Sequence, residues 1–422
     1  MESVEALVTS LVGQADARLV EADADLARRY PGDPVERRPV HTVYVPADRY
    51  EPATPRHWGD RALELLDDHA PDAATAARAT GLDPDLVARS LDRVRAKLAD
   101  QPVEDLRVDL EDGYGVRPDE EEDAAVRSAV AGLASYGSGE PWAPTWYGVR
   151  FKSLEAPTRA RGVRSLVQVV AGLAAAGRVP ERLRLTLPKV TSVDQVRVMV
   201  DLVRQLETAL GLPAGSLTFE IQVETPQAVM APDGTAAVAA MVHAAAGRCT
   251  GLHYGTFDYS AALGITAAYQ SADHPAADHA KAVMQLAAAQ TGVTVSDGST
   301  NVAAFGDTDA AHATWRLHAR LVTRALERGI YQGWDMHPGH LVSRYLATFC
   351  FFRAALPGAA ARLRGYVDRV EGGVMDEPAT ARALAGAVLR GVSCGAVDEA
   401  EALAACGMAR AELTALVGGR RG

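Results

Sequence analysis

The sequence predicts an α/β protein, a (β/α)8 barrel of the TIM type. Short apolar runs rich in Val, Ile, Tyr and Leu alternate with Ala-rich amphipathic stretches of helix length. This alternation is typical of parallel βαβ units. The apolar runs number eight, which is the count that closes such a barrel. The chain has 422 residues, enough for a barrel of roughly 250 residues with further segments at its ends.

The predicted strands follow one another along the chain, and a predicted helix separates most of them. The strands are expected at residues 41–46, 105–112, 146–152, 182–190, 217–224, 250–258, 292–298 and 330–337. The helices are expected at residues 160–176, 193–210, 235–246, 274–290 and 309–328. An open doubly wound sheet shows the same alternation, but its dinucleotide-binding form carries GxGxxG after an early strand. The segment "SYGSGE" at 135–140 has neither that spacing nor a following helix, so the barrel is favoured.

Helical segments are expected before, within and after the barrel. Residues 3–30 have helical apolar spacing and end before the turn signal "YPGDP". A helical insertion at about 55–100 enlarges the first crossover, and Asp83 and Pro84 form an N-terminal cap pattern within it. The predicted parts are an N-terminal helical segment (1–38), the barrel with its insertion (39–340) and a C-terminal helical extension (341–422).

Composition limits the possible partners and the compartment. A net charge of -11 argues against a nucleic-acid or anionic-membrane surface. The N-terminus carries acidic residues where a secretory signal needs basic ones, and no run of apolar residues is long enough to span a membrane. The four cysteines are scattered, without a CxxC pair. These features predict a cytoplasmic protein without a thiolate zinc site.

Polar residues stand at the ends of almost all predicted strands. In this fold the catalytic groups lie at the C-terminal ends of the strands, so these residues are the candidates for chemistry. They are Asp109, Glu111, Asp112, Arg150, Lys152, Lys189, Glu224, Asp258, Asp297, Asp335 and His337.

Glu224 and Asp258 are expected to meet at the mouth of the barrel. Carboxylate oxygens with room for water and substrate are what Mg²⁺ prefers in proteins; alternatively, both are surface acids at helix N-termini. Glu220 has the same strand parity as Glu224 but lies roughly 13 Å deeper, so a structural ion pair is expected there. Asp109 and Glu111 point to one side of their strand, either as site acids or as loop-stabilising groups.

The cationic candidates and the histidine each have two interpretations. Arg150 points inward, where a guanidinium is costly unless it pairs with an anion, either Asp109 or a substrate oxyanion. Lys189 has the same ambiguity, and a Schiff-base role would need a lowered pKa. His337, in "DMHPGH", is either structural or a catalytic base.

Several motifs together resemble one superfamily. "FEIQVETPQAV" and "GLHYGTFDYSAALGI" resemble the metal-site motifs of citrate lyase β-chains, malyl-CoA and citramalyl-CoA lyases, malate synthases and metal-dependent pyruvate aldolases. "HTVYVPADRY", "VDLEDGYG", "GVRFKSLEA", "LTLPKV" and "QGWDMHPGHL" resemble further strands of the group, in the same order. The resemblance covers most of the chain and implies a TIM barrel of the phosphoenolpyruvate-binding type.

The resemblance implies roles for the candidate residues. Glu224 and Asp258 would bind Mg²⁺, or Mn²⁺, and Arg150 would polarise the oxyanion. Three acids would lie beside the metal: Asp109, Glu111 and Asp112. Lys189 and His337 are assigned to cofactor binding.

A catalytic base is expected in the C-terminal extension. "VMDEPATA" (374–381) resembles the Met-Glu-Asp motif of malate synthases with its acids in swapped order. Either Asp376 or Glu377 would then be the acid or base.

The implied function is a Mg²⁺-dependent carbon–carbon lyase or synthase that acts through a metal-stabilised enolate. Its substrate would be a small 2-oxo or 2-hydroxy acid, of the malyl-CoA, citramalyl-CoA or malate type, with a CoA thioester as possible co-substrate. A CoA-independent class II aldolase that releases pyruvate or glyoxylate is the alternative, and a non-catalytic barrel subunit is a further one. The resemblance also implies a homo-oligomer.

Overall fold

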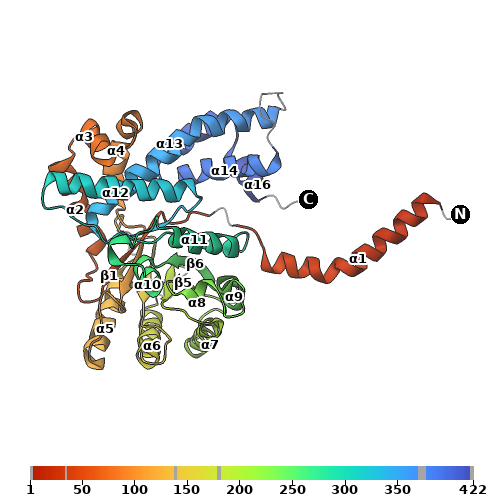
Figure 1. Ribbon diagram of the computed structural model, residues 1–422, viewed down its shortest axis with the longest axis horizontal. Helices are drawn as coiled ribbons and strands as arrows, with labels where there is room; N and C mark the ends of the chain where they lie inside the picture. Colours follow the sequence, from red (N-terminus) through yellow and green to blue (C-terminus); the bar gives the residue numbers. More distant parts are fainter. Residues whose placement is uncertain (1–2, 34–35, 137–139, 178–181, 369–376, 419–422) are drawn as a thin grey trace.

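The protein forms a nearly closed parallel barrel, which confirms the predicted fold class (Figure 1). The computed structural model describes residues 3–33, 36–136, 140–177, 182–368 and 377–418. The strands are β1 (His41–Pro46), β2 (Asp105–Asp109), β3 (Trp146–Arg150), β4 (Leu183–Leu187), β5 (Phe219–Val223), β6 (Cys249–Tyr254), β7 (Thr294–Ser296) and β8 (Gly333–Asp335). Their order is β7-β6-β5-β4-β3-β2-β1-β8. A single parallel bridge between Ser296 and Gln332 joins β7 to the start of β8.

Several strands are shorter than the sequence predicts. The apolar runs continue into polar residues that keep the alternation of a strand but lie in loops or helices, as after Asp109. The largest difference at a C-terminal end concerns the sixth strand, which the sequence predicts to run to Asp258. It ends at Tyr254, and Asp258 lies in the first turn of a short helix, α10 (Thr256–Ala262). An acidic side chain is favourable there because the helix N-terminus carries a partial positive charge.

Helices cover the outside of the barrel between successive strands (Figure 1). They are α5 (Asp119–Ser135), α6 (Arg159–Ala175), α7 (Val193–Leu210), α8 (Pro226–Val229), α9 (Ala237–Ala244), α11 (Pro275–Ala288) and α12 (Thr308–Glu327), with a short 3-10 turn, η1 (Ala267–Tyr269). Apolar residues on each inward face close the layer between helices and strands, as Val169 and Val203 do. None of the helices in the described ranges is both long and apolar enough to cross a membrane.

Two further groups of helices lie together at one side of the barrel (Figure 1). The first crossover contains α2 (Thr54–His69), α3 (Ala73–Thr80) and α4 (Pro84–Asp100), and the chain after β8 forms α13 (Pro338–Asp368), α14 (Pro378–Ser393), α15 (Glu399–Cys406) and α16 (Arg410–Gly418). The Asp83 side chain caps α4 by accepting from the N–H of Leu86, as the cap pattern predicts. The long α13 packs against α2, α4, α12 and α14, so the insertion and the C-terminal helices form one layer.

The first helix, α1 (Val4–Arg29), extends away from the rest of the chain (Figure 1). It has no buried residue. Its apolar side chains are exposed, for example Leu7 at 48% and Leu19 at 51%. The helix therefore contributes nothing to the core of the barrel.

The interior of the barrel contains a layer of paired charges below its mouth. Arg107 is fully buried and donates from Nη2 to Glu220 at 2.8 Å. His253 Nε2 lies 3.4 Å from the same carboxylate. Burial alone would raise the pKa of Glu220, but the charge of Arg107 outweighs it and lowers the pKa. Glu220 is thus the paired structural acid that its depth predicts.

Candidate active site

Arg150 and Asp109 form a buried ion pair at the C-terminal mouth of the barrel. They are register partners at the ends of β3 and β2. The Arg150 guanidinium donates to both oxygens of Asp109, from Nε at 2.7 Å and from Nη2 at 2.5 Å. Burial would lower the pKa of Arg150, but the charge of Asp109 raises it well above its usual value. Arg150 is therefore a permanently charged group with a fixed orientation.

Asp109 also stabilises the loop that follows β2. Its two oxygens accept hydrogen bonds from the N–H groups of Glu111 and Gly113, each at 2.9 Å. These hydrogen bonds confirm the loop-stabilising interpretation of Asp109; its place beside a metal stays a prediction. The loop brings Glu111 to 3.6 Å from Arg150 Nη1, and Asp112 to 4.0 Å from the same atom.

The Lys189 ammonium joins acids from separate parts of the chain. Its Nζ lies 2.9 Å from Asp112 Oδ2, 3.0 Å from Asp258 Oδ2 and 3.5 Å from Glu111 Oε1. Burial would lower the pKa of Lys189, but the surrounding acids, Glu224 first, raise it far above its usual value. An amine held protonated is no nucleophile, so this environment does not support a Schiff-base role.

Glu224 lies directly after β5 and is 2% exposed. Its Oε1 accepts a hydrogen bond from the backbone N–H of Lys189 at 2.8 Å. This contact holds Lys189 in a left-handed conformation with φ 48°, which is costly for a residue with a side chain. Burial raises the pKa of Glu224 to about 7, and Asp258 adds to this rise while Arg150 and Lys189 oppose it.

Gly255 lets α10 approach Glu224. A Cβ at Gly255 would lie 2.4 Å from Glu224 Cβ and 2.6 Å from Oε2. The backbone at Gly255 has an ordinary φ of -98°, so the requirement for glycine is steric. This close approach places Asp258, three residues later, over the same group of acids.

The acids of the mouth outnumber its cations. Asp109, Glu111, Asp112, Glu224 and Asp258 surround the two cationic side chains, Arg150 and Lys189. Burial raises the pKa of Glu111 to about 8. The charge of Arg150 opposes this rise, and the neighbouring Asp112 adds to it. An all-carboxylate donor set with excess negative charge is what a hard divalent cation needs. The residues present therefore fit the chemistry of a Mg²⁺ ion, and Glu224 and Asp258 are among the acids that could hold it.

Three residues around Arg150 were not among the sequence candidates. Gln222 is fully buried and its Oε1 lies 3.4 Å from Arg150 Nη1. The rings of Tyr44 and Trp334 have their centroids 5.0 Å and 5.4 Å from the guanidinium carbon. Gln222 lies between Glu220 and Glu224 and has the same strand parity. This parity predicts that its side chain points into the barrel. The two aromatic residues carry no comparable signal.

His337 lies apart from the acidic cluster. It precedes α13, accepts from the N–H of Gly339 at 3.0 Å and stacks on Phe305 with ring centroids 4.8 Å apart. Burial lowers the pKa of His337 to about 4, and His340 adds to the shift. The structure shows a structural role for His337 at the start of a helix, and no contact with the cluster among the described residues.

The remaining strand-end charges are paired elsewhere. Lys152 donates to Glu122 at 2.7 Å, and Asp297 accepts from Lys281 at 2.8 Å. Asp335 is bound by Arg344, His41 and His318. The side chains of His318, Asp335 and His340 are near enough to hold a metal, but the Arg344 guanidinium already neutralises this carboxylate, so the cluster is better explained as a salt-bridge network.

Glu377 stands at the start of α14 and is exposed. It makes no contact with the acidic cluster within the described ranges, and Asp376 lies outside them. Later residues of α14, such as Leu389 and Arg390, line a cavity at the opposite end of the barrel.

Comparison with known proteins defines the family. A family model described as "Domain of unknown function (DUF6986)" matches residues 19–420. The chain belongs to the DUF6986 family. A search of curated proteins found no match.

A solved structure shares the fold of this DUF6986 member, and two more were found as similar. A citrate lyase from Burkholderia xenovorans LB400 has a TM-score of 0.55 and 20% sequence identity, and the match covers 78% of this chain and 92% of that chain. A magnesium/glyoxylate complex of Haloferax volcanii malate synthase has a TM-score of 0.49 and 14% identity, covering 91% and 98%. CitE from Mycobacterium tuberculosis with magnesium, acetoacetate and coenzyme A has a TM-score of 0.49 and 18% identity, covering 86% and 100%. The citrate lyase match confirms, at the level of the fold, the resemblance that the motifs indicate.

Proposed function

We propose that this protein is an enzyme that makes or breaks a carbon–carbon bond beside the carbonyl of a small 2-oxo or 2-hydroxy acid. One observation carries the proposal: the acids at the ends of β2 and β5 and on α10 converge with Arg150 and Lys189 at the mouth of the barrel. In the proposal, Glu224 and Asp258 hold Mg²⁺. When bound, this ion acts as a Lewis acid on the carbonyl oxygen of the substrate.

Arg150 supplies a fixed positive charge for the developing oxyanion. Asp109 occupies Nε and Nη2, whereas Nη1 has only long contacts, 3.4 Å to Gln222 and 3.6 Å to Glu111. Nη1 is therefore the donor available to a substrate oxygen. Because Asp109 fixes the guanidinium in advance, little reorganisation is needed when negative charge develops.

Gln222 is suited to bind the carboxylate of the substrate. Within the described part of the chain, its Nε2 atom is buried without a hydrogen-bond partner. A buried donor without a partner costs about 1–3 kcal/mol, and a substrate oxygen would remove that cost. The proposed substrate is accordingly an anion that meets Arg150 and Gln222 together.

The motif resemblance supports a 2-hydroxy acid of the malyl-CoA, citramalyl-CoA or malate type as the first candidate, with a CoA thioester as possible substrate. A CoA-independent aldolase that releases pyruvate or glyoxylate is the second. The segments "QVET" and "DYSAALG" resemble those of such aldolases. For the first candidate, the resemblance implies Asp376 or Glu377 as the acid or base.

Turnover assays with purified protein and Mg²⁺ test the proposal. One arm contains acetyl-CoA with glyoxylate and follows thiol release, a second contains malyl-CoA or citramalyl-CoA, and a third contains a 4-hydroxy-2-oxo acid and follows pyruvate or glyoxylate. We expect turnover in one arm that EDTA and Glu224→Gln abolish, whereas Glu64→Gln, an exposed acid on α2, has no effect. Turnover in the third arm alone selects the aldolase. The proposal is wrong if no arm turns over and Mg²⁺ binding, measured by calorimetry, is the same in Glu224→Gln and the wild type.

A further inference from the structure

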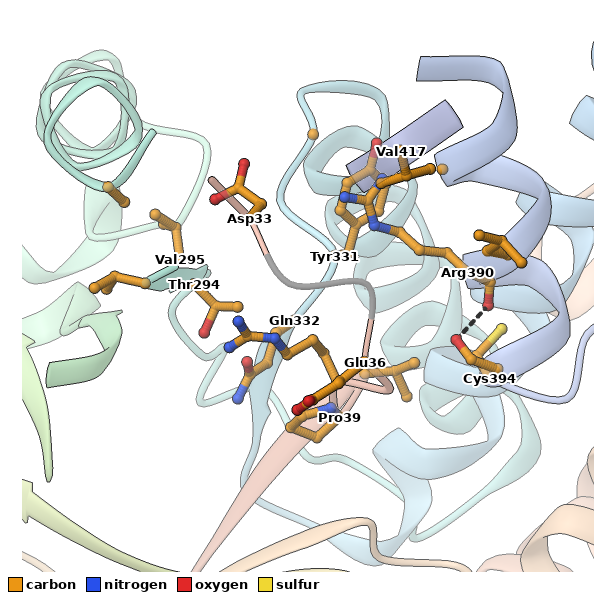
Figure 2. A pocket seen from close by; sticks show the side chains of 18 of the residues that line it. Asp33, Glu36, Pro39, Thr294, Val295, Tyr331, Gln332, Arg390, Cys394 and Val417 are labelled. Carbon is orange, nitrogen blue, oxygen red and sulfur yellow. Dashed lines mark hydrogen bonds between the residues drawn. The ribbon is translucent and has the colours of Figure 1, made fainter. Parts of the chain in front are cut away.

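A cavity of about 340 Å³ lies at the opposite end of the barrel from the acidic cluster. Its walls include residues at the N-terminal ends of strands: Val40 directly before β1, Thr294 at the start of β7 and Gln332 directly before β8. The C-terminal half of α14 closes the other side, with Leu389 and Arg390 (Figure 2). The volume is that of a small-molecule site.

Two arginines border this cavity without a carboxylate partner. Arg38 is half-buried, and its one hydrogen bond to the described residues runs from Nη2 to the carbonyl of Gly292 at 2.8 Å. The Arg390 guanidinium lies 4.3 Å from the centroid of the Tyr331 ring, and Figure 2 shows its side chain reaching over that ring. No acid within the described ranges lies within ion-pair distance of either arginine. Arg38 is half-buried, and a half-buried cation without a counter-ion is unfavourable, whereas Arg390 is exposed.

The electrostatics of Arg38 agree with this geometry. Its pKa is lowered, by burial first and then by the positive charges of Arg184 and Arg390. Asp33 and Glu36 oppose the shift, but both are exposed at the rim (Figure 2). The lining thus contains two acids and two arginines, and within the described ranges neither arginine lies within ion-pair distance of these acids.

The other walls are suited to an apolar group. Phe352, Leu389, Val293 and Val295 line the cavity. Cys394 also faces it, and burial raises the pKa of this thiol to about 12. A thiol that stays protonated is no nucleophile, so these walls serve reversible binding and no covalent chemistry.

We propose that this cavity binds a small organic anion, with its carboxylate or phosphate group on Arg38 and Arg390 and its apolar body against Phe352 and Leu389. The site does not depend on the proposed activity, because it shares no residue with the mouth of the barrel. Arg390 touches neither the acidic cluster nor Arg150, so a change at Arg390 leaves basal activity unaltered.

Calorimetric titration with four probes tests the site: phenyl phosphate, benzoate, inorganic phosphate and benzyl alcohol. We expect the two aromatic anions to bind most tightly, inorganic phosphate more weakly and benzyl alcohol not at all. Arg390→Gln should weaken the binding of the aromatic anions about tenfold or more, because a charge-assisted hydrogen bond is lost. Arg197→Gln, an exposed arginine on α7, is the matched control and should leave binding within about twofold of the wild type.

Two further variants keep the test decisive. Arg38→Gln should weaken the binding of the aromatic anions as Arg390→Gln does. If Arg38→Gln fails to fold, Arg390→Gln still tests the site, because Arg390 is exposed. Arg150→Ala should retain binding, because Arg150 lies at the other end of the barrel. The proposal is overturned if no probe binds at millimolar concentration, if benzyl alcohol binds as tightly as benzoate, or if inorganic phosphate binds as tightly as phenyl phosphate. Binding that is lost in Arg150→Ala but kept in Arg390→Gln also overturns it.

Discussion

Arg150 combines full burial with a two-point hydrogen bond to Asp109. Lysine cannot reproduce this geometry, because its ammonium is a point charge without a planar fork. We therefore expect both Arg150→Lys and Arg150→Ala to lower kcat roughly 100-fold to 1,000-fold, the usual effect of removing one oxyanion donor. The measurement is steady-state kinetics on the substrate that the turnover assays identify, with Arg197→Lys as the control. Full activity of Arg150→Lys would show that positive charge alone suffices.

Lys189 occupies the position among the acids that a metal ion would share. Its ammonium lies 2.9 Å from Asp112 and 3.0 Å from Asp258, so it competes electrostatically with a divalent cation. We predict that Lys189→Met tightens Mg²⁺ binding roughly tenfold, as measured by calorimetry. Arg197→Met removes the same charge from an exposed position and should not change the affinity. Weaker Mg²⁺ binding in Lys189→Met would instead assign Lys189 to orienting the acids.

The position of most site acids could be predicted from the sequence, because each follows a run of strand formers. The contacts between them could not. Lys189 adopts its left-handed conformation only because its N–H reaches Glu224, which is 35 positions later in the chain. Gln222 is recognisable as inward-facing, but its contact with Arg150 depends on how β3 and β5 are placed in the closed barrel.

At the scale of elements, the start of α10 positions the acids that we propose as Mg²⁺ ligands. Because a Cβ at Gly255 would meet the Glu224 side chain at 2.4 Å, Gly255→Ala must displace either Glu224 or α10. We expect Mg²⁺ affinity and turnover to fall at least about tenfold, with the fold retained by circular dichroism. Gly306→Ala is the matched control, since no atom lies within 4 Å of a Cβ there. Equal Mg²⁺ affinity in both variants would exclude Glu224 as a ligand.

Two histidines at the start of α13, His337 and His340, are expected to make the stability depend on pH. Burial is the first cause that lowers the pKa of His340 and of His337 from 6.5 to about 4. Between these values the unfolded chain binds protons that the folded protein does not, so stability falls as the pH falls through this window and levels off below about 4. The two histidines should therefore contribute a decrease in melting temperature between pH 6.5 and 4, whereas Glu224 and Glu111, whose pKa values are raised, contribute in the opposite direction.

His340→Gln should make this decrease shallower. Glutamine stays neutral and can still donate to the Val302 carbonyl, which His340 Nε2 contacts at 2.8 Å. His279→Gln, at an exposed position on α11, should keep the wild-type slope. Thermal melts from pH 7 to pH 4 measure the difference, and identical slopes for the two variants would contradict the assignment.

Element types were easier to predict than element ends. The β-branched runs of β1 to β6 and the amphipathic helices between strands carry strong periodic signals. The sequence after β6 continues as "GTFDYS", which reads equally well as the end of a strand, although residues from Thr256 on form α10. Only the packing of Gly255 against Glu224 decides between the two, and that contact joins segments far apart in sequence.

At the scale of the whole molecule, the sequence predicted the parallel barrel because eight strand signals alternate with helices. It did not predict how the ring closes. β7 and β8 each have three residues, and one bridge, between Ser296 and Gln332, joins them. The cavity at the foot of the barrel could not be predicted from the sequence either, because α14 lies near Val40 and Thr294 only in the folded chain. The homo-oligomer stays a prediction.

The stability of the molecule is unevenly distributed between its two ends. The helix α1 buries no side chain, so removing the residues up to Arg29 should leave the melting temperature unchanged within about 1 °C. At the other end, Leu413 on α16 is fully buried against the C-terminal layer. Leu413→Ala should cost about 2–5 kcal/mol, because it removes buried methyl groups and leaves a cavity.

Differential scanning calorimetry of the truncated chain, Leu413→Ala and Leu19→Ala measures this contrast. Leu19 is the matched control for Leu413, since the same methyl groups are removed from a side chain that is 51% exposed on α1. A lower melting temperature in the truncated chain or in Leu19→Ala would show that α1 is packed against something in solution, and the size of the decrease would measure that contact. An unchanged value in both, together with a clear decrease in Leu413→Ala, would place the stability in the barrel and its C-terminal layer, where the buried apolar area lies.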